Sequence, residues 1–195
     1  QILVAGEELK LKASKNGDLV AADNKQINRM RSEIGFVFQN FNLWPHMSVL
    51  DNIIEAPRRV LGQSRAEATE MAEALLAKVG IADKRHVYPA QLSGGQQQRA
   101  AIARTLAMQP KVILFDEPTS ALDPEMVQEV LNVIRALADE GRTMLLVTHE
   151  MNFARQVSSE VVFLHQGLVE EQGPPDQVFD NPQSARCKQF MSSNR

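Results

Sequence analysis

Cysteine and long apolar runs are both scarce in this chain of 195 residues. The single cysteine, Cys187, cannot form a disulfide within the chain, so an internal disulfide framework is excluded and a reducing, cytosolic-side location is expected. The longest uninterrupted apolar runs, such as Val112–Phe115 and Val161–Leu164, are far shorter than a membrane-spanning helix requires. A chain of this length can nevertheless bury a sizeable core, so the sequence predicts a folded domain outside the bilayer.

An excess of positive charge is also absent. The chain has 21 basic and 24 acidic residues, which gives a formal net charge of −3. This balance argues against a main role in coating nucleic acid or binding anionic lipid, and no nucleic-acid partner is expected. His46, His86 and His165 lack the spacing of metal ligands, so no zinc site is predicted.

Local patterns predict an α/β fold with a parallel sheet as its core. Short buried strands such as Val112–Phe115 alternate with helices, which indicates parallel pairing. One helix is bounded by a capping box at Ser64 and by Gly80, and another by Asp123 and Gly141. We expect four consecutive regions: antiparallel strands followed by a core strand (1–39), a helical subdomain (40–91), the rest of the core (92–170) and a C-terminal helical segment (171–195).

The strongest local signal for a ligand site is a buried strand that ends in two carboxylates. Asp116 and Glu117 follow the apolar run Val112–Phe115, and open α/β sheets bind ligands at the carboxyl ends of their strands. An acidic pair at such an edge can hold Mg²⁺ and accept a proton from an attacking water. Asp116 fits the first role and Glu117 the second, whereas Asp139–Glu140 and Glu170–Glu171 are expected to be solvated helix ends.

A second signal is the Leu-Ser-Gly-Gly-Gln run Leu92–Gln96, which stands at the start of a helical pattern. Ser93, Gly94 and Gly95 would let backbone N–H groups and the positive end of the helix approach an anionic oxygen closely. Taken alone, however, the run is more typical of an ordinary loop and helix cap.

Together with two further runs, these signals resemble the nucleotide-binding subunits of ABC transporters. The run Leu92–Gln96 is similar to the family signature, Val112–Glu117 to Walker B, Ser120–Asp123 to the D-loop and His149 to the switch histidine. Gln39, after an apolar strand, is similar to the glutamine of the Q-loop. The order and spacing match the family throughout the chain.

This resemblance implies a P-loop NTPase (RecA-like) core that binds ATP and Mg²⁺ and hydrolyses the ATP. In the family, the counterpart of Glu117 activates water, that of His149 contacts the γ-phosphate, and those of Asp116 and Gln39 contact Mg²⁺. Two subunits close head to tail, so that the signature residues contact ATP held by the other subunit. The residues assigned to this shared nucleotide site are Ser93, Gly94, Gly95, Gln96 and Asp123. Asp123 is also expected to cap the helix that follows it, so its role at the shared site is only part of the explanation for an aspartate there.

Other runs resemble the ATP-binding subunits of importers for polar amino acids. These runs are Tyr88–Gln91, Phe41–Val49, Glu55–Pro57, His149–Ala154 and Phe179–Pro182, and an extended hairpin expected over Leu9–Arg31 resembles the branch that serves histidine, arginine-type or opine substrates. The resemblance implies integral-membrane permease partners, an indirect link with a periplasmic solute-binding protein, and a position on the cytoplasmic face of the bacterial inner membrane. Trp44 and Met47 then fit either the groove that receives the permease or the helical core.

One motif of the family is missing from the sequence. No G-x-x-x-x-G-K-S/T loop, which is the Walker A phosphate cradle, occurs in residues 1–195. We therefore expect that the natural protein has a segment before Gln1 and that this chain alone is inactive. A non-hydrolysing regulatory or docking module on a permease remains an alternative. A second alternative is a soluble ABC ATPase that acts in DNA repair or translation. Such ATPases usually carry a coiled coil or a second cassette, for which 195 residues leave no room.

Overall fold

The computed structural model describes residues 2–193, which divide into two compact units. The first unit ends at Leu145 and the second begins at Leu146. Among the described residues, no helix combines the length and the apolar character needed to cross a bilayer. The division into four regions stays a prediction.

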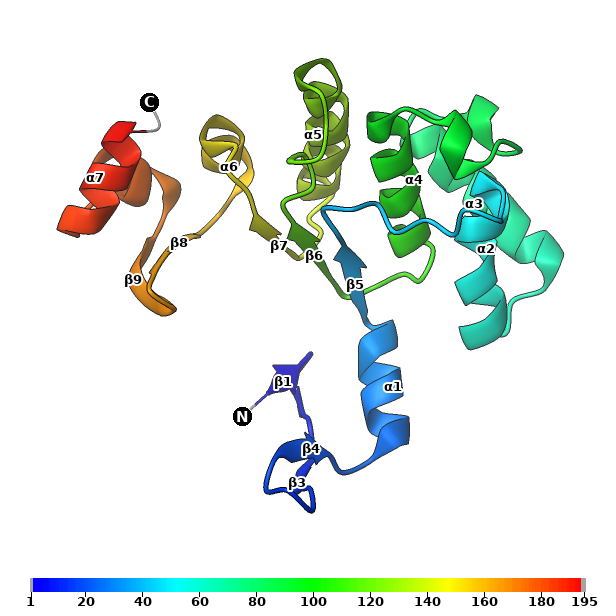
Figure 1. Ribbon diagram of the computed structural model, residues 1–195, viewed down its shortest axis with the longest axis horizontal. Helices are drawn as coiled ribbons and strands as arrows, with labels where there is room; N and C mark the ends of the chain where they lie inside the picture. The colour runs from blue at the N-terminus through cyan, green and yellow to red at the C-terminus, as the bar shows by residue number, and fades with distance from the viewer. Residues whose placement is uncertain (1, 194–195) are drawn as a thin grey trace. The chain divides into compact units, whose positions relative to one another are not determined.

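The first unit begins with two short antiparallel hairpins and a helix (Figure 1). The paired strands are β1 (Leu3–Val4) with β2 (Glu7–Glu8), and β3 (Leu11–Ala13) with β4 (Leu19–Ala21). Helix α1 (Asn24–Ser32) then begins after Asp23, whose carboxylate accepts a hydrogen bond from the Lys25 N–H. The hairpin expected over Leu9–Arg31 is therefore wrong in its second half. The helix was hidden because its buried residues are only Gln26 and Met30, so no apolar stripe marks it.

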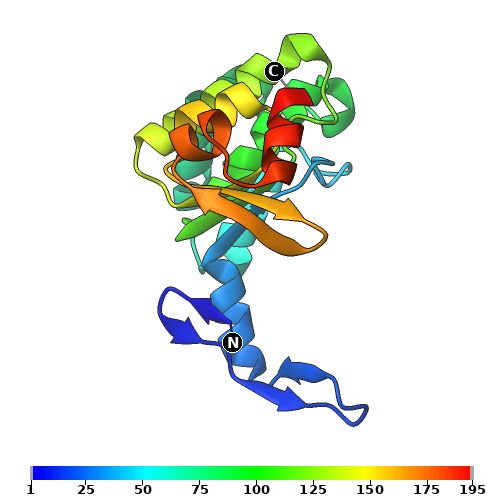
Figure 2. The same ribbon diagram turned by 90° about the vertical axis from the view of Figure 1, so that its left-hand side faces the viewer.

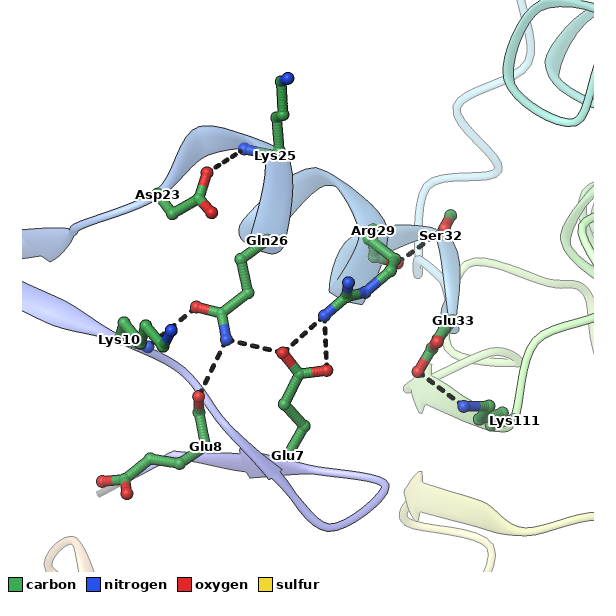
Figure 3. A network of polar contacts seen from close by, with 10 residues as sticks. All are labelled: Glu7, Glu8, Lys10, Asp23, Lys25, Gln26, Arg29, Ser32, Glu33 and Lys111. Atoms are coloured by element: carbon green, nitrogen blue, oxygen red, sulfur yellow. Dashed lines mark hydrogen bonds and ion pairs between the residues drawn. The ribbon is translucent and has the colours of Figure 1, made fainter.

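One buried side chain fastens α1 to the strands before it (Figure 3). The Gln26 carboxamide donates to Glu7 Oε1 at 2.7 Å and to the Glu8 carbonyl at 3.0 Å, and it accepts from the Lys10 N–H at 3.0 Å. Arg29, on the next turn of α1, pairs with the same Glu7 carboxylate. These contacts, led by the hydrogen bond from Gln26, hold the pKa of Glu7 below its ordinary value. A polar network thus replaces an apolar core in this part of the unit.

Three helices pack against one another in the next part of the first unit (Figure 1). They are α2 (Val49–Val60), α3 (Arg65–Lys78) and α4 (Gly94–Leu106), and the single turns η1 (Ala82–Lys84) and η2 (Pro89–Gln91) lie between α3 and α4. The predicted capping box is present, because Ser64 Oγ accepts from the Glu67 N–H and the Glu67 carboxylate accepts from the Ser64 N–H. The completely buried side chains of these helices include Ile53, Leu76 and Ile102.

The parallel pairing predicted for the core is confirmed. Strand β5 (Ile34–Val37) lies parallel to β6 (Val112–Asp116), and Gly35 stands opposite Ile113. Strand β7 (Met144–Val147) follows in the order β5-β6-β7, and α5 (Pro124–Asp139) connects β6 to β7. Helix α4 packs closely on β5 because Gly35 has no side chain; a Cβ there would lie 2.5 Å from Thr105 Cγ2.

The second unit combines a hairpin with three helical segments (Figure 2). Its elements are α6 (Met151–Val157), β8 (Val161–His165), β9 (Leu168–Gly173), the π-helical turn η3 (Asp176–Asp180) and α7 (Ala185–Ser193). Strand β8, which contains the apolar run Val161–Leu164, pairs antiparallel with β9 and not parallel like the strands of the first unit. The reason is a tight turn in which Gln166 and Gly167 have φ values of +50° and +78°. Val178, Phe179, Cys187 and Met191 form the core of this unit.

A buried carboxylate joins β9 to the C-terminal helix. Glu171 accepts hydrogen bonds from the N–H groups of Gln183 at 2.8 Å and Ser184 at 2.9 Å, just before α7. The expectation that Glu170–Glu171 is a solvated helix end is therefore wrong, since both residues lie in β9 and Glu171 is buried. Burial raises the pKa of Glu171, but the hydrogen bonds that it accepts outweigh this effect and hold the pKa below its ordinary value.

Candidate functional site

The two carboxylates at the end of β6 stand on a strained turn. Asp116 is the last residue of β6 and is exposed, whereas Glu117 is half-buried. Glu117 has a φ of +43°, in the left-handed region that a residue with a side chain occupies only at a cost. Ser120 fixes this turn, because its N–H (3.2 Å) and its hydroxyl (2.9 Å) both donate to the Glu117 carbonyl. Strain of this kind is concentrated at functional sites, which supports the prediction for Glu117.

Ser93 and Gln96 form the N-terminal cap of α4. Ser93 Oγ accepts from the Gln96 N–H at 3.3 Å, and the Gln96 carboxamide accepts from the Ser93 N–H at 3.1 Å. Capping is therefore one role of both residues. A hydroxyl has a hydrogen to donate besides its lone pairs, so Ser93 can still donate to an anionic oxygen at this end of the helix.

Gly94 and Gly95 allow α4 to pack closely against the segment after β6. A Cβ on Gly94 would lie 3.1 Å from Leu122 Cδ2, and one on Gly95 would lie 3.0 Å from Met126 Cβ. The Gly95 N–H donates to Met126 Sδ at 3.4 Å, and a thioether is a weak acceptor. The approach of a phosphate to these glycines stays a prediction. The D-loop residue Leu122 and the first turn of α5 do lie directly against the signature.

Gln39 lies exposed just after β5, in a segment that Arg104 of α4 fastens. The guanidinium donates to the Asn42 carbonyl at 2.7 Å and to the Phe41 carbonyl at 3.3 Å. It also lies 5.5 Å from the centre of the Trp44 ring, a cation–π distance. Burial lowers the pKa of Arg104. The backbone that follows Gln39 is thus held by the same helix that begins at the signature.

An open groove of about 360 Å³ lies beside this segment. Its lining includes Phe36, Phe38, Trp44 and Arg104. Three of its aromatic rings are partly exposed, with exposed fractions of 40% for Phe36, 41% for Phe38 and 39% for Trp44. Of the two alternatives for Trp44, this exposed position favours a surface role over a place in the helical core.

Two residues of α4 make contacts between distant segments that the sequence did not predict. Gln98 is completely buried and donates to the carbonyl of Phe38, next to Gln39, and to that of Pro118, next to Glu117. Arg99 donates to the Gly80 carbonyl at 3.3 Å and pairs with Glu129 of α5 at 2.8 Å. Both residues stand in the run after the signature, but nothing in that run marks which side chain is buried. The structure thereby brings the Q-loop, the signature helix, Walker B and the D-loop together in the first unit.

Asp123 stands at the start of α5, and His149 lies in the second unit. Asp123 stands at the N-cap position of α5, as predicted, but its carboxylate makes no capping hydrogen bond within the described residues. Capping therefore does not account for Asp123. His149 belongs to the second unit, where its side chain is 56% exposed and its Nε2 lies 3.7 Å from Glu150 Oε1. Its contact with the γ-phosphate stays a prediction.

The exposed polar groups of the first unit are of the chemical types that bind Mg²⁺ and a nucleotide. Asp116 and Gln39 offer a carboxylate and an amide oxygen, and Mg²⁺ prefers oxygen ligands. No cluster of three or more His, Cys, Asp or Glu side chains that could hold a metal occurs in residues 2–193. A Mg²⁺ at this edge would therefore take most of its ligands from phosphate oxygens and water, which is usual for this ion.

Comparison with known proteins decides the family. The profile described as ABC transporter matches residues 2–120, which is more than half of the chain. The chain belongs to the ABC transporter family. This ABC protein is 62% identical over 194 residues to the arginine/ornithine transport ATP-binding protein AotP of Pseudomonas aeruginosa, covering 100% of the chain and 76% of the relative. The nopaline permease ATP-binding protein P of Agrobacterium fabrum is 60% identical, with 99% and 75% covered.

Solved structures confirm the fold predicted from the sequence. A dimeric ATP-binding cassette in a post-hydrolysis state, bound to ADP and Pi, is 36% identical and matches with a TM-score of 0.67, covering 78% of this ABC protein and 68% of that chain. CbiO1 from Clostridium perfringens, part of an ABC transporter complex, is 30% identical and matches with a TM-score of 0.74, covering 85% and 66%. The core is thus the α/β core of an ATP-binding cassette.

Proposed function

We propose that this ABC protein is the ATP-binding and ATP-hydrolysing subunit of an importer for polar amino acids, of the kind that takes up basic amino acids or opines. The observation that carries the proposal is the convergence on α4, which begins at the signature and holds the backbone beside both Gln39 and Glu117. The relatives support the substrate class, since their names refer to arginine and ornithine transport and to a nopaline permease.

We assign roles in the proposed reaction to the polar residues that follow β5 and β6 and to His149. Glu117 accepts the proton of the attacking water as a general base, and the turn fixed by Ser120 keeps its carboxylate in place. Asp116 and Gln39 would hold Mg²⁺, which neutralises negative charge on the phosphates when it is bound. His149 donates to the γ-phosphate in this proposal.

The signature residues act on a second subunit. Ser93, Gly94, Gly95 and Gln96 lie at the N-terminal end of α4, where backbone N–H groups and the helix dipole favour an anion. We assign them to the γ-phosphate of ATP held by the other subunit of a head-to-tail dimer, with Asp123 at the same shared site. The dimeric state of the solved cassette bound to ADP and Pi supports an assembly of this type.

The groove beside Gln39 is assigned to the permease. Its exposed rings, including Phe36, Phe38 and Trp44, offer an apolar surface to an integral-membrane subunit at the cytoplasmic face of the bacterial inner membrane. A periplasmic solute-binding protein would deliver the amino acid to the permease from the other side. The formal net charge of −3 gives no reason to assign a nucleic-acid partner.

Replacing the general base tests the proposed function. In the full-length gene product assembled with its permease, we expect Glu117→Gln to lower phosphate release by about 10²- to 10⁴-fold while ATP binding persists, as for loss of a general base. Glu70→Gln, an exposed substitution on α3, is the matched control and should keep wild-type turnover. Near wild-type turnover by the Glu117 variant, or no hydrolysis by the wild type, would overturn the proposal, and the latter would favour a non-hydrolysing docking module.

A further inference from the structure

Gln98 is the completely buried polar side chain that touches two motifs at once. Its Nε2 donates to the Phe38 carbonyl at 3.1 Å and to the Pro118 carbonyl at 2.8 Å. Both partners are carbonyl oxygens, which only accept, so the amide nitrogen must face them. Its Oε1 is then buried without a hydrogen-bond partner in the described structure.

The unpaired oxygen shows what the amide contributes. A buried acceptor without a partner destabilises a fold, and native proteins contain few of them. An apolar side chain at this position would avoid that cost but would lose both donated bonds. The two bonds to Phe38 and Pro118 are therefore the contribution that distinguishes Gln98 from a simple core residue. A second buried oxygen without a partner, Thr119 Oγ1, lies in the same turn.

The two carbonyls are well placed to fix reacting groups. The Phe38 carbonyl belongs to the peptide group that also contains the Gln39 N–H, so a bond to it limits rotation just before Gln39. The Pro118 carbonyl lies one residue beyond Glu117, whose own carbonyl is held by Ser120. The consecutive carbonyls of Glu117 and Pro118 are therefore both held, which restricts the strained backbone that carries the Glu117 carboxylate.

We infer that Gln98 is a positioning residue that ties the signature helix to the backbone of Gln39 and to that of Glu117. The inference rests on the proposed function of this site. Ser93 caps the N-terminal end of α4. A shift of this helix when the signature binds phosphate therefore moves the Gln98 amide. That movement reaches the turn that carries Glu117, the general base of the same subunit. Because Gln98 is completely buried, it acts through Glu117 and Gln39 and not on the nucleotide directly.

Steady-state kinetics of the full-length ATPase, assembled with its permease, separate positioning from mere stability. We expect Gln98→Leu to lower kcat about 10- to 100-fold, since small misplacement of a catalytic group has effects of this size. KM for MgATP should stay within about twofold, because no group that contacts nucleotide is removed. Ile102→Val, one turn along α4 at another completely buried position, is the control that loosens the same packing without touching a hydrogen bond. This control should keep kcat.

A second variant keeps the test decisive if Gln98→Leu does not fold. Gln98→Glu keeps the shape of the side chain but donates only when it is protonated. Its kcat per folded subunit, with the folded fraction measured by circular dichroism at each pH, should therefore rise relative to that of the wild type as the pH falls. A purely structural role changes only the folded fraction and gives a constant ratio. An unchanged kcat in Gln98→Leu, an equal loss in Ile102→Val, or a pH-independent ratio would overturn the inference. Wild-type protein without hydrolysis would instead overturn the proposed function.

Discussion

The left-handed turn at Glu117 makes a prediction about stability that is independent of catalysis. A residue with a Cβ is strained at a φ of +43°, whereas glycine is not. Glu117→Ala and Glu117→Gly both remove the carboxylate and all contacts of the side chain. The difference between these two variants therefore reports the effect of the backbone at this position and not the loss of the carboxylate.

Two opposing effects set the size of that difference. The left-handed region costs a residue with a Cβ about 1–2 kcal/mol, and this cost disappears in the glycine variant. Glycine loses more backbone entropy on folding, which costs about 0.5–1 kcal/mol relative to alanine. Because Ser120 holds the Glu117 carbonyl by two hydrogen bonds, the backbone cannot easily relax away from this φ. We expect the glycine variant to be more stable than the alanine variant by about 0.5–1 kcal/mol.

Urea unfolding followed by tryptophan fluorescence measures this difference. The chain has one tryptophan, Trp44, and it lies in the first unit together with Glu117, so the signal reports the relevant unit. Ala74→Gly, at an exposed position within α3, is the matched control and should be destabilising by about 1 kcal/mol. The opposite signs at the two positions are the test. If the glycine variant at position 117 were less stable than the alanine variant, the turn would not be strained in solution.

Two further substitutions test the permease groove and the second unit. Trp44→Ala should lower solute uptake by the assembled transporter while the affinity of the subunit for ATP stays within about twofold, because the ring lines the groove and not the end of β6. Leu61→Ala is the control, because Leu61 is an exposed apolar residue at the C-terminal end of α2 and does not line the groove. Equal uptake by the Trp44 variant and this control would refute the assignment. The pKa of Glu171 is lowered in the folded state, so its stabilising effect is present above its ordinary pKa of 4.5 and is lost as the pH falls through the folded value. Hydrogen exchange of the α7 amides, corrected for its intrinsic pH dependence, should accelerate below about pH 4.5 in the wild type, whereas Glu171→Gln should show no such acid-dependent step; identical behaviour of the two would contradict this.

Features that depend on neighbouring residues in the chain could be predicted from the sequence. The capping box at Ser64 is set by local hydrogen bonding, the start of α5 by a proline at its first position, and the strand that ends at Asp116 by apolar spacing. The ordered motifs indicated the family for the same reason, since each is a short run with its own chemistry. Helix α1 escaped prediction because a buried amide, Gln26, takes the place of an apolar stripe.

The role of Gln98, the third of the three glutamines after Gly95, was decided only by the tertiary structure. Gln96 stands three residues after Ser93, which is the position of a capping box, but no local pattern tells which of Gln97 and Gln98 is buried. Successive residues of a helix point about 100° apart, so each amide meets a different environment. Gln96 caps its own helix, Gln97 donates to the Leu92 carbonyl, and Gln98 is buried between the backbones of β5 and of the turn after β6. That last environment exists only once residues 38, 98 and 118, which are far apart in the chain, have packed together.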